Sequence, residues 1–180
     1  PMSEKFGKTL DDQIIIISSP DSHLWKTAGS RNIEKIEWEK DVGERFSAFI
    51  VAHTTTLEIA GLDAKAFVEG GKEHDQDKAQ KLAEKIFQNY KQEADVLDFF
   101  IFNSELEDLG KWCRQLIAES LATFTPTVSI GPTDLHSMLE LYLENPTSRF
   151  TLFIRSEKAI DESVNESAYD NATEAFEREG

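Results

Sequence analysis

Two nearly uninterrupted apolar runs constrain the fold of this chain more than any other feature. The first is four consecutive isoleucines at residues 14–17, followed by Ser18-Ser19-Pro20, and the second is residues 96–102, which are apolar except for Asp98. Apolar runs that do not alternate with polar residues predict strands buried on both faces, and such strands are typical of parallel sheets. The chain is therefore expected to contain a buried parallel sheet.

Strand and helix patterns alternate along the rest of the sequence. Further strands are expected at residues 33–38, 127–130 and 150–154, and helices at residues 24–30, 45–59, 62–69, 77–93, 107–121 and 134–144. This order predicts an α/β fold, a three-layer αβα sandwich with about five parallel strands in a flavodoxin-like, doubly wound sheet. Ligands of such sheets bind beyond the carboxyl ends of the strands, which selects the loops at residues 18–22, 103–107 and 131–134.

The domain organisation is expected to be simple. Residues 13–160 are predicted to form one domain, preceded by a disordered or tag-derived lead-in at residues 1–12. Residues 161–180 carry small apolar side chains at near-helical spacing among many acidic ones, and are predicted to form an acidic helix of the same domain.

Charge and cysteine content exclude several classes of function. The chain has 34 acidic and 19 basic residues and a formal net charge of -15, which repels nucleic acid and anionic membrane surfaces. Its one cysteine, Cys113, excludes an internal disulfide and is compatible with a reducing, cytoplasmic location. Cys113 also falls on the predicted core face of its helix, which indicates an inert small hydrophobe.

His136 stands near the start of a helix with clear entry and exit signals. Thr133 is a candidate N-cap, Asp134 lies in the first turn, and Asn145-Pro146 ends the helix. The positive end of the helix dipole disfavours imidazolium, so His136 is expected to stay neutral and to accept a proton near neutral pH. The alternative is a structural histidine bonded to a neighbouring backbone group.

Glu119 lies on the helix predicted at residues 107–121. Helical periodicity places it at the edge of an apolar arc, which is made of Leu109, Trp112, Cys113, Leu116 and Ser120. A carboxylate at such an edge loses solvation, and the resulting rise in pKa suits a general base. The alternative is a glutamate that borders the core and reaches solvent.

Arg45 follows Gly43 in the first turn of another predicted helix, where a cation opposes the helix dipole. That placement indicates an arginine that shares an anionic ligand with the free backbone donors of the helix start. The alternative is a surface arginine paired with Asp41 or Glu44. His23, His53 and His74 lack metal-ligand spacing, and the nucleotide-binding glycine loops are missing, so no metal and no cofactor are expected.

Three motifs in this order resemble the second sugar-isomerase (SIS) domain of the phosphoglucose isomerase family, which interconverts glucose 6-phosphate and fructose 6-phosphate. Residues 41–47, DVGERFS, resemble the family's VGGRFS, and residues 60–71 resemble the glycine-containing run that follows it. Residues 112–121, WCRQLIAESL, are similar to WWRQLxAESLGK. Residues 131–146, GPTDLHSMLELYLENP, are similar to GATDQHSQLQLYLEGP.

The resemblance implies a role for each candidate residue. Glu119 matches the base that moves a proton between C1 and C2 through a cis-enediol, and His136 matches the group that opens the sugar ring. Arg45 matches the arginine that stabilises the enediolate, and Gly43 belongs to the same substrate-binding turn. In the family the histidine reaches the site from the neighbouring subunit, which implies a homodimer.

Several positions depart from the family pattern. Glu44 replaces a glycine, and residues 122–126 replace Gly-Lys and a longer loop. The family's phosphate-binding Ser/Thr-rich loop and its C-terminal lysine have no counterpart in residues 1–180. We therefore expect a fragment that lacks a preceding SIS domain and a C-terminal segment and is inactive alone. The alternatives are a non-catalytic module that binds sugar phosphates for regulation, and a domain used only for subunit assembly.

Overall fold

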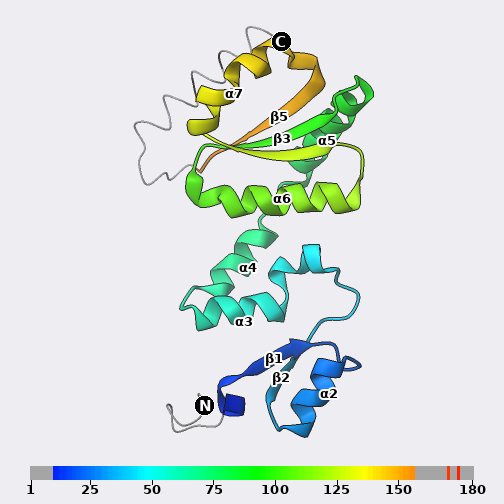
Figure 1. The fold of residues 1–180 in the computed structure, drawn as a ribbon, viewed down its shortest axis with the longest axis vertical. Helices are drawn as coiled ribbons and strands as arrows, with labels where there is room; N and C mark the ends of the chain where they lie inside the picture. Colours follow the sequence, from blue (N-terminus) through cyan, green and yellow to red (C-terminus); the bar gives the residue numbers. More distant parts are fainter. Residues whose placement is uncertain (1–9, 157–169, 171–173, 175–180) are drawn as a thin grey trace. The chain divides into compact units, whose positions relative to one another are not determined.

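A computed structural model describes residues 10–156 together with residues 170 and 174. Contacts between Cα atoms divide the chain into two compact units, residues 1–74 and residues 75–180 (Figure 1). Most of the predicted lead-in, and the predicted acidic helix apart from residues 170 and 174, lie outside the described residues. The single domain over residues 13–160 stays a prediction.

The first unit is built on a strand, helix and strand. The elements are η1 (Leu10–Gln13), β1 (Ile15–Ser18), α2 (His23–Ser30), β2 (Glu34–Glu37), η2 (Glu44–Phe49), α3 (Val51–Ile59) and α4 (Ala64–Lys72). Strands β1 and β2 pair in parallel, with Ile15 opposite Glu34. The Ser22 hydroxyl caps α2 by accepting a hydrogen bond from the Trp25 amide at 3.0 Å. Ile16, Ala28 and Ile33 form the small core between helix and strands.

Two predictions for this unit need correction. Ile15 is 44% exposed while Ile16 is buried, so β1 is not buried on both faces. The helix predicted at residues 45–59 is two elements, because Ile50 adopts an extended backbone (ψ 164°) between η2 and α3. The predicted end of α3 is confirmed, since Gly61 takes a φ of 78° that only glycine adopts readily.

The second unit contains a three-stranded parallel sheet in the order β4-β3-β5. Its elements are α5 (Gln76–Lys91), β3 (Val96–Ile101), η3 (Ser104–Leu106), α6 (Glu107–Ser120), β4 (Thr125–Ile130), α7 (Thr133–Glu144), η4 (Pro146–Ser148) and β5 (Arg149–Ile154). Each strand and helix that the sequence predicts between residues 77 and 154 is present within a few residues of the expected bounds.

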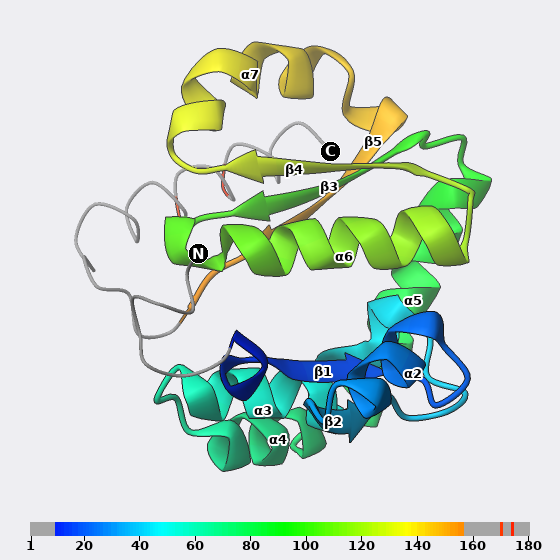
Figure 2. The same cartoon turned by 60° about the horizontal axis from the view of Figure 1, so that its bottom comes forward.

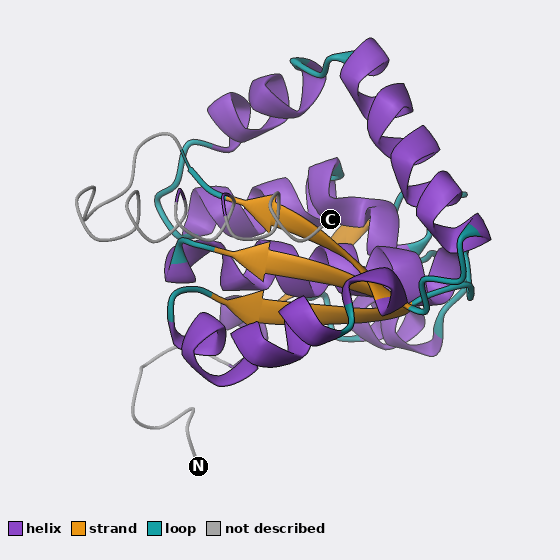
Figure 3. Ribbon diagram, turned by 90° about the horizontal axis from the view of Figure 1, so that it is seen from above, coloured by secondary structure: helices purple, strands orange, loops and turns teal. Residues whose placement is uncertain are grey.

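Alternate residues of β3 pack on opposite faces of this sheet. Leu97, Phe99 and Ile101 belong to a core that includes side chains of α5 and α6, while Phe100 and Phe102 pack with Tyr142 of α7. The unit is therefore a three-layer αβα sandwich, with α6 and α7 on opposite sides of the strands (Figures 2 and 3). The predicted α/β class is confirmed, but the described strands form two sheets of two and three strands, where the sequence predicts one sheet of about five.

The buried face of α6 also differs from the prediction. Cys113 and Ile117 pack on the sheet, whereas Leu109 is 38% exposed. Gly110, one turn before Cys113, is also buried, and there is little room for a side chain at this position. A Cβ there would lie 3.0 Å from Val128 and 3.1 Å from Ile101. The helix thus approaches the sheet through its glycine, and the apolar arc is rotated away from the one inferred from Leu109.

The start of α7 corrects the predicted cap. Pro132 occupies the N-cap position and Thr133 is already helical, so no hydroxyl caps this helix. Asp134 in the first turn instead bonds to the strand, since its Oδ2 accepts a hydrogen bond from the Ile130 amide of β4 at 2.6 Å. This bond fixes the first turn of α7 to the end of β4.

Candidate functional site

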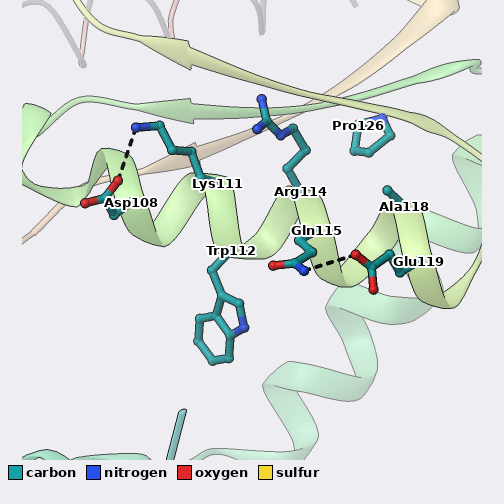
Figure 4. A pocket seen from close by; sticks show the side chains of 8 residues that line it. All are labelled: Asp108, Lys111, Trp112, Arg114, Gln115, Ala118, Glu119 and Pro126. Atoms are coloured by element: carbon teal, nitrogen blue, oxygen red, sulfur yellow. Dashed lines mark hydrogen bonds and ion pairs between the residues drawn. The ribbon is translucent and has the colours of Figure 1, made fainter. Parts of the chain in front are cut away.

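Glu119 lies in the last turn of α6 and is exposed. Its Oε1 accepts a hydrogen bond from Gln115 Nε2 at 3.0 Å, one turn earlier on the helix (Figure 4). The prediction that this carboxylate loses solvation is therefore wrong for the described chain, because its side chain is exposed to solvent. Because Ile117 turns into the core, Glu119, two residues later on a helix of 3.6 residues per turn, projects outward.

An open groove runs along α6 beside Glu119. Its lining residues come from α6 and from the start of β4, and they are Asp108, Lys111, Trp112, Arg114, Gln115, Ala118, Glu119 and Pro126 (Figure 4). The Lys111 ammonium contacts the carboxylates of Glu107 at 2.9 Å and Asp108 at 3.1 Å, and these hydrogen bonds raise its pKa. The groove therefore offers a carboxylate near one end of α6, a cation near the other, and an indole between them.

His136 is exposed in the first turn of α7. That helix begins directly after the carboxyl end of β4, which is one of the positions where ligands of parallel sheets are expected. The flanking side chains Leu135 and Met138 pack on Phe100, Phe102 and Tyr142, so the backbone that carries His136 is held against the sheet.

The structure does not bring Glu119 and His136 together within one chain. Glu119 ends a helix that packs on one face of the sheet and leads into the amino end of β4, where Pro126 lines its groove. His136 begins the helix on the other face, beyond the carboxyl end of β4. The end of α6 that carries Glu119 and the start of α7 that carries His136 are therefore on opposite faces and at opposite ends of the sheet, and Figure 2 shows the two helices on opposite sides of the strands.

Gly43 and Arg45 lie in the first unit. Gly43 is the N-cap of η2, with φ -64° and ψ 144°, and Arg45 follows in the first turn as the sequence predicts. The Arg45 guanidinium carbon lies 5.1 Å from the centroid of the Phe46 ring. The motif's backbone geometry is thus set by a short 3₁₀ helix, where the sequence predicts the start of an α-helix.

A pocket at the carboxyl ends of β1 and β2 adjoins this motif. It has a volume of about 460 Å³ and is lined by Ile17, Ser18, Ser19, Trp38, Glu44, Ser47 and His53. The predicted ligand loop at residues 18–22 and the motif residues Glu44 and Ser47 therefore meet at one cavity. Glu44, which replaces a glycine of the resembled motif, contributes a carboxylate to it.

Sequence reasoning missed two members of this pocket. The rings of Trp38 and His53 meet edge to face, with centroids 6.1 Å apart, and the Trp38 indole N–H donates to the Val42 carbonyl at 3.4 Å. The position of Trp38 directly after β2 was a signal, because strand ends bear ligands in this class. His53 gave no such signal, since only folding of η2 and α3 brings it to the strand ends.

Within the part of the chain that the structure describes, no group of three or more His, Cys, Asp or Glu side chains could hold a metal ion. In the same residues, no helix is long and apolar enough to cross a membrane. Burial raises the pKa of the Cys113 thiol, so a nucleophilic thiolate is disfavoured there, as the prediction of an inert cysteine requires.

Parallel strands covered by helices, three of them in a three-layer αβα sandwich, define an α/β protein. Comparison with curated proteins shows which members of this class the chain is similar to. The chain is 28% identical over 186 residues to a probable glucose-6-phosphate isomerase of Methanococcus maripaludis, covering 94% of this chain and 42% of the relative. It is 27% identical over 163 residues to the glucose-6-phosphate isomerase of Campylobacter jejuni, covering 83% of this chain and 40% of that enzyme.

The glucose-6-phosphate isomerase of Methanocaldococcus jannaschii is 29% identical over 164 residues, which cover 78% of this chain and 39% of the enzyme. No protein-family model matches the chain. The chain spans about two fifths of the length of these relatives. The resemblance to glucose-6-phosphate isomerases that the three motifs indicate is thus confirmed by similarity along most of the chain.

Proposed function

We propose that this chain is the second sugar-isomerase domain of a glucose-6-phosphate isomerase, active as part of the whole protein. The observation that carries the proposal is the order of the three motifs, together with similarity along most of the chain to curated isomerases. The proposed substrates are glucose 6-phosphate and fructose 6-phosphate, and the proposed pathways are glycolysis and gluconeogenesis. A cytoplasmic location fits this role and the lone cysteine.

The proposed reaction assigns one proton-transfer step to each candidate group. His136 protonates the ring oxygen as the pyranose opens, while the anomeric hydroxyl loses its proton and becomes the C1 carbonyl. Glu119 then takes the C2 proton, the electron pair of that C–H bond forms the C1–C2 double bond, and the electron pair of the carbonyl moves to O1 as a cis-enediolate. A proton passes from the C2 hydroxyl to O1, the C2 carbonyl forms, and the electron pair of the C1–C2 double bond takes the proton back from Glu119 at C1 to give the ketose. Arg45 stabilises the negative oxygen of the enediolate, with Gly43 shaping the turn beside it.

The geometry of Glu119 supports the role of base in a specific way. The carboxylate is exposed, lines the groove, and is oriented by the hydrogen bond that its Oε1 accepts from Gln115 Nε2 (Figure 4). A general base must be held within hydrogen-bond reach of the proton that it abstracts, and a carboxylate on the wall of a groove can meet a substrate bound there. Closure of the groove by substrate and by other parts of the assembly would supply the desolvation that the isolated unit lacks.

The placement of His136 supports a homodimer as the active form. Glu119 and His136 face away from one another across one sheet, so a shared substrate needs a second copy of the chain. The phosphate group needs its own donors, and we assign these to a preceding sugar-isomerase domain outside this chain. The isolated chain is accordingly expected to show negligible turnover.

Solvent exchange of the substrate C2 proton tests the proposal directly. In the whole protein, Glu119→Gln should abolish incorporation of deuterium at C2, whereas Glu84→Gln, the same change at an exposed position of α5 outside the groove, should leave it intact. Exchange at the wild-type rate in Glu119→Gln would remove Glu119 from the role of base. Near-normal isomerisation by the 180-residue chain alone would refute the need for further segments.

A non-catalytic sugar-phosphate-binding module is the second candidate. Glu44 favours it, because a carboxylate in the strand-end pocket opposes the anionic enediolate that Arg45 is proposed to stabilise. Binding of fructose 6-phosphate by the whole protein without C2 exchange would select this candidate over the isomerase.

A further inference from the structure

Asp98 is a fully buried carboxyl group in the central strand of the second unit. It interrupts an otherwise apolar strand, and the proposed isomerase chemistry does not use it. A buried carboxylate is costly unless hydrogen bonds satisfy it, so its partners indicate why the strand carries it.

Three hydroxyl groups converge on this carboxyl group. Asp98 Oδ1 accepts from Thr127 Oγ1 at 2.5 Å, and Ser129 Oγ lies 3.0 Å from each of its oxygens. The Tyr142 hydroxyl donates to Oδ2 at 3.3 Å and lies 3.0 Å from Ser129 Oγ. Thr127 and Ser129 are on the neighbouring strand β4, whereas Tyr142 belongs to α7, so the network joins the sheet to the helix.

Tyr142 is held on its other sides as well. It is 1% exposed, its ring meets Phe100 edge to face at 6.2 Å, and the Arg149 guanidinium carbon lies 4.3 Å from its centroid. These ring contacts do not involve the hydroxyl. The hydroxyl adds direction to the packing, because a hydrogen bond to Asp98 depends on distance and angle and so restricts the rotation and height of α7 on the sheet.

Helix α7 is consequently fixed to the sheet at both ends. Asp134 binds the Ile130 amide at the first turn, and Tyr142 binds Asp98 two turns later. His136 lies between them, six residues or about 9 Å of helix from Tyr142. A shift or rotation of α7 moves the imidazole with it.

We propose that Asp98 is a positioning residue, which fixes α7 through the Tyr142 hydroxyl and thereby sets the place of His136 on the surface. The inference deepens the proposed function and rests on it for its catalytic consequence. The structural claim, that this network controls the placement of α7, does not depend on the proposed isomerase function.

Tyr142→Phe and Thr127→Val form a matched pair of tests. Each removes one hydroxyl from Asp98 and keeps the size of its side chain, but only Tyr142 belongs to α7. Loss of one such bond is expected to speed hydrogen exchange of the α7 amides about tenfold in Tyr142→Phe. In Thr127→Val the exchange of α7 relative to α6 should stay as in the wild type.

A second readout follows His136 itself. The imidazole C–H resonances of His136 should move in Tyr142→Phe and keep their wild-type position in Thr127→Val. Equal effects of the two variants on α7, or no effect of Tyr142→Phe on exchange and resonances, would overturn the proposal.

Kinetics of the whole protein separates this inference from the proposed function. Tyr142→Phe should lower kcat about tenfold with little change of KM, because the substrate still binds while the proton donor is misplaced. Wild-type kcat in Tyr142→Phe would overturn the positioning role. Absence of isomerase activity in the wild-type whole protein would instead refute the proposed function, and the exchange and resonance results would still decide whether Asp98 controls α7.

Discussion

Glu119 and His136 lie on opposite faces of one three-stranded sheet, Glu119 toward the amino end of β4 and His136 beyond its carboxyl end. The six residues of β4 span about 20 Å, which exceeds the length of a hexose phosphate. One copy of the chain therefore cannot apply both groups to one substrate molecule. If both act in the proposed isomerase, each site combines Glu119 of one subunit with His136 of another.

This arrangement predicts complementation between inactive variants. Whole-protein Glu119→Gln and His136→Ala should each be inactive, yet mixing and reassociating them in equal amounts should restore about a quarter of wild-type activity. Half of the dimers are then mixed, and each mixed dimer has one site with both groups intact. The measurement is a coupled isomerase assay after reversible dissociation. Each variant reassociated with itself is the control, and a mixture as inactive as its components would contradict the shared site.

Substitution of glycine by alanine is expected to change the free energy of unfolding in opposite directions at Gly110 and Gly70. A methyl group at Gly110 would lie 3.0 Å from Val128 and 3.1 Å from Ile101, whereas at Gly70 nothing lies within 4 Å. Gly110→Ala should lower the free energy of unfolding by about 1–3 kcal/mol, because overpacking outweighs the gain in helix propensity. Gly70→Ala should raise it by up to about 1 kcal/mol. Urea denaturation checks both, and a stabilised Gly110→Ala would show that α6 can move off the sheet.

The sequence predicted the elements of the second unit well because its periodicities are strong. The apolar run at residues 96–102 and the helical pattern at residues 107–121 both correspond to observed elements. The predicted buried face of α6 is right at Cys113 and wrong at Leu109, because helical periodicity assigns large apolar side chains to the core. In the structure the close approach is made at Gly110, which has no side chain to register in a hydrophobic pattern.

The relation between the candidate site residues depends on the order of the strands. Local sequence predicts that Glu119 ends one helix and His136 begins another, and both placements are confirmed. Which face of the sheet each helix covers follows from long-range strand pairing, which no local pattern contains. Asp98 was visible as a charged residue in a buried strand, but its partners on β4 and α7 required the fold.

The Glu44 carboxylate is expected to weaken the binding of anionic ligands at the strand-end pocket of the first unit, compared with the same pocket without this charge. Removal of its charge by Glu44→Gln should tighten binding of fructose 6-phosphate to the whole protein about fivefold, because a charge at about 4 Å in water is worth about 1 kcal/mol. Glu34→Gln makes the same charge change at the amino end of β2 and should leave the affinity unchanged. Calorimetric titration measures both. Equal affinities of wild type and Glu44→Gln would show that fructose 6-phosphate does not bind at this pocket.

Ionisation of the Cys113 thiol and the Tyr142 phenol is expected to lower the stability of the fold at alkaline pH. Burial raises the pKa of the Cys113 thiol above 9.0, and burial together with the charge of Asp98 raises the pKa of the Tyr142 phenol above 10.0. The unfolded chain therefore releases these protons first as the pH rises. Their contribution to stability is complete below about pH 9 and is lost as the pH passes through the raised values, by at most about 1.4 kcal/mol per pH unit for each group.

Cys113→Ala isolates the thiol's share of this loss. Between about pH 8 and pH 10.5 the free energy of unfolding should fall less steeply in Cys113→Ala than in the wild type, because one of the linked protons is absent. Ser120→Ala, an exposed substitution on the same helix, should keep the wild-type slope. Urea denaturation across this range measures all three proteins. Parallel slopes for the wild type and Cys113→Ala would mean that the thiol ionises alike in the folded and unfolded chain, and so that α6 does not bury it in solution.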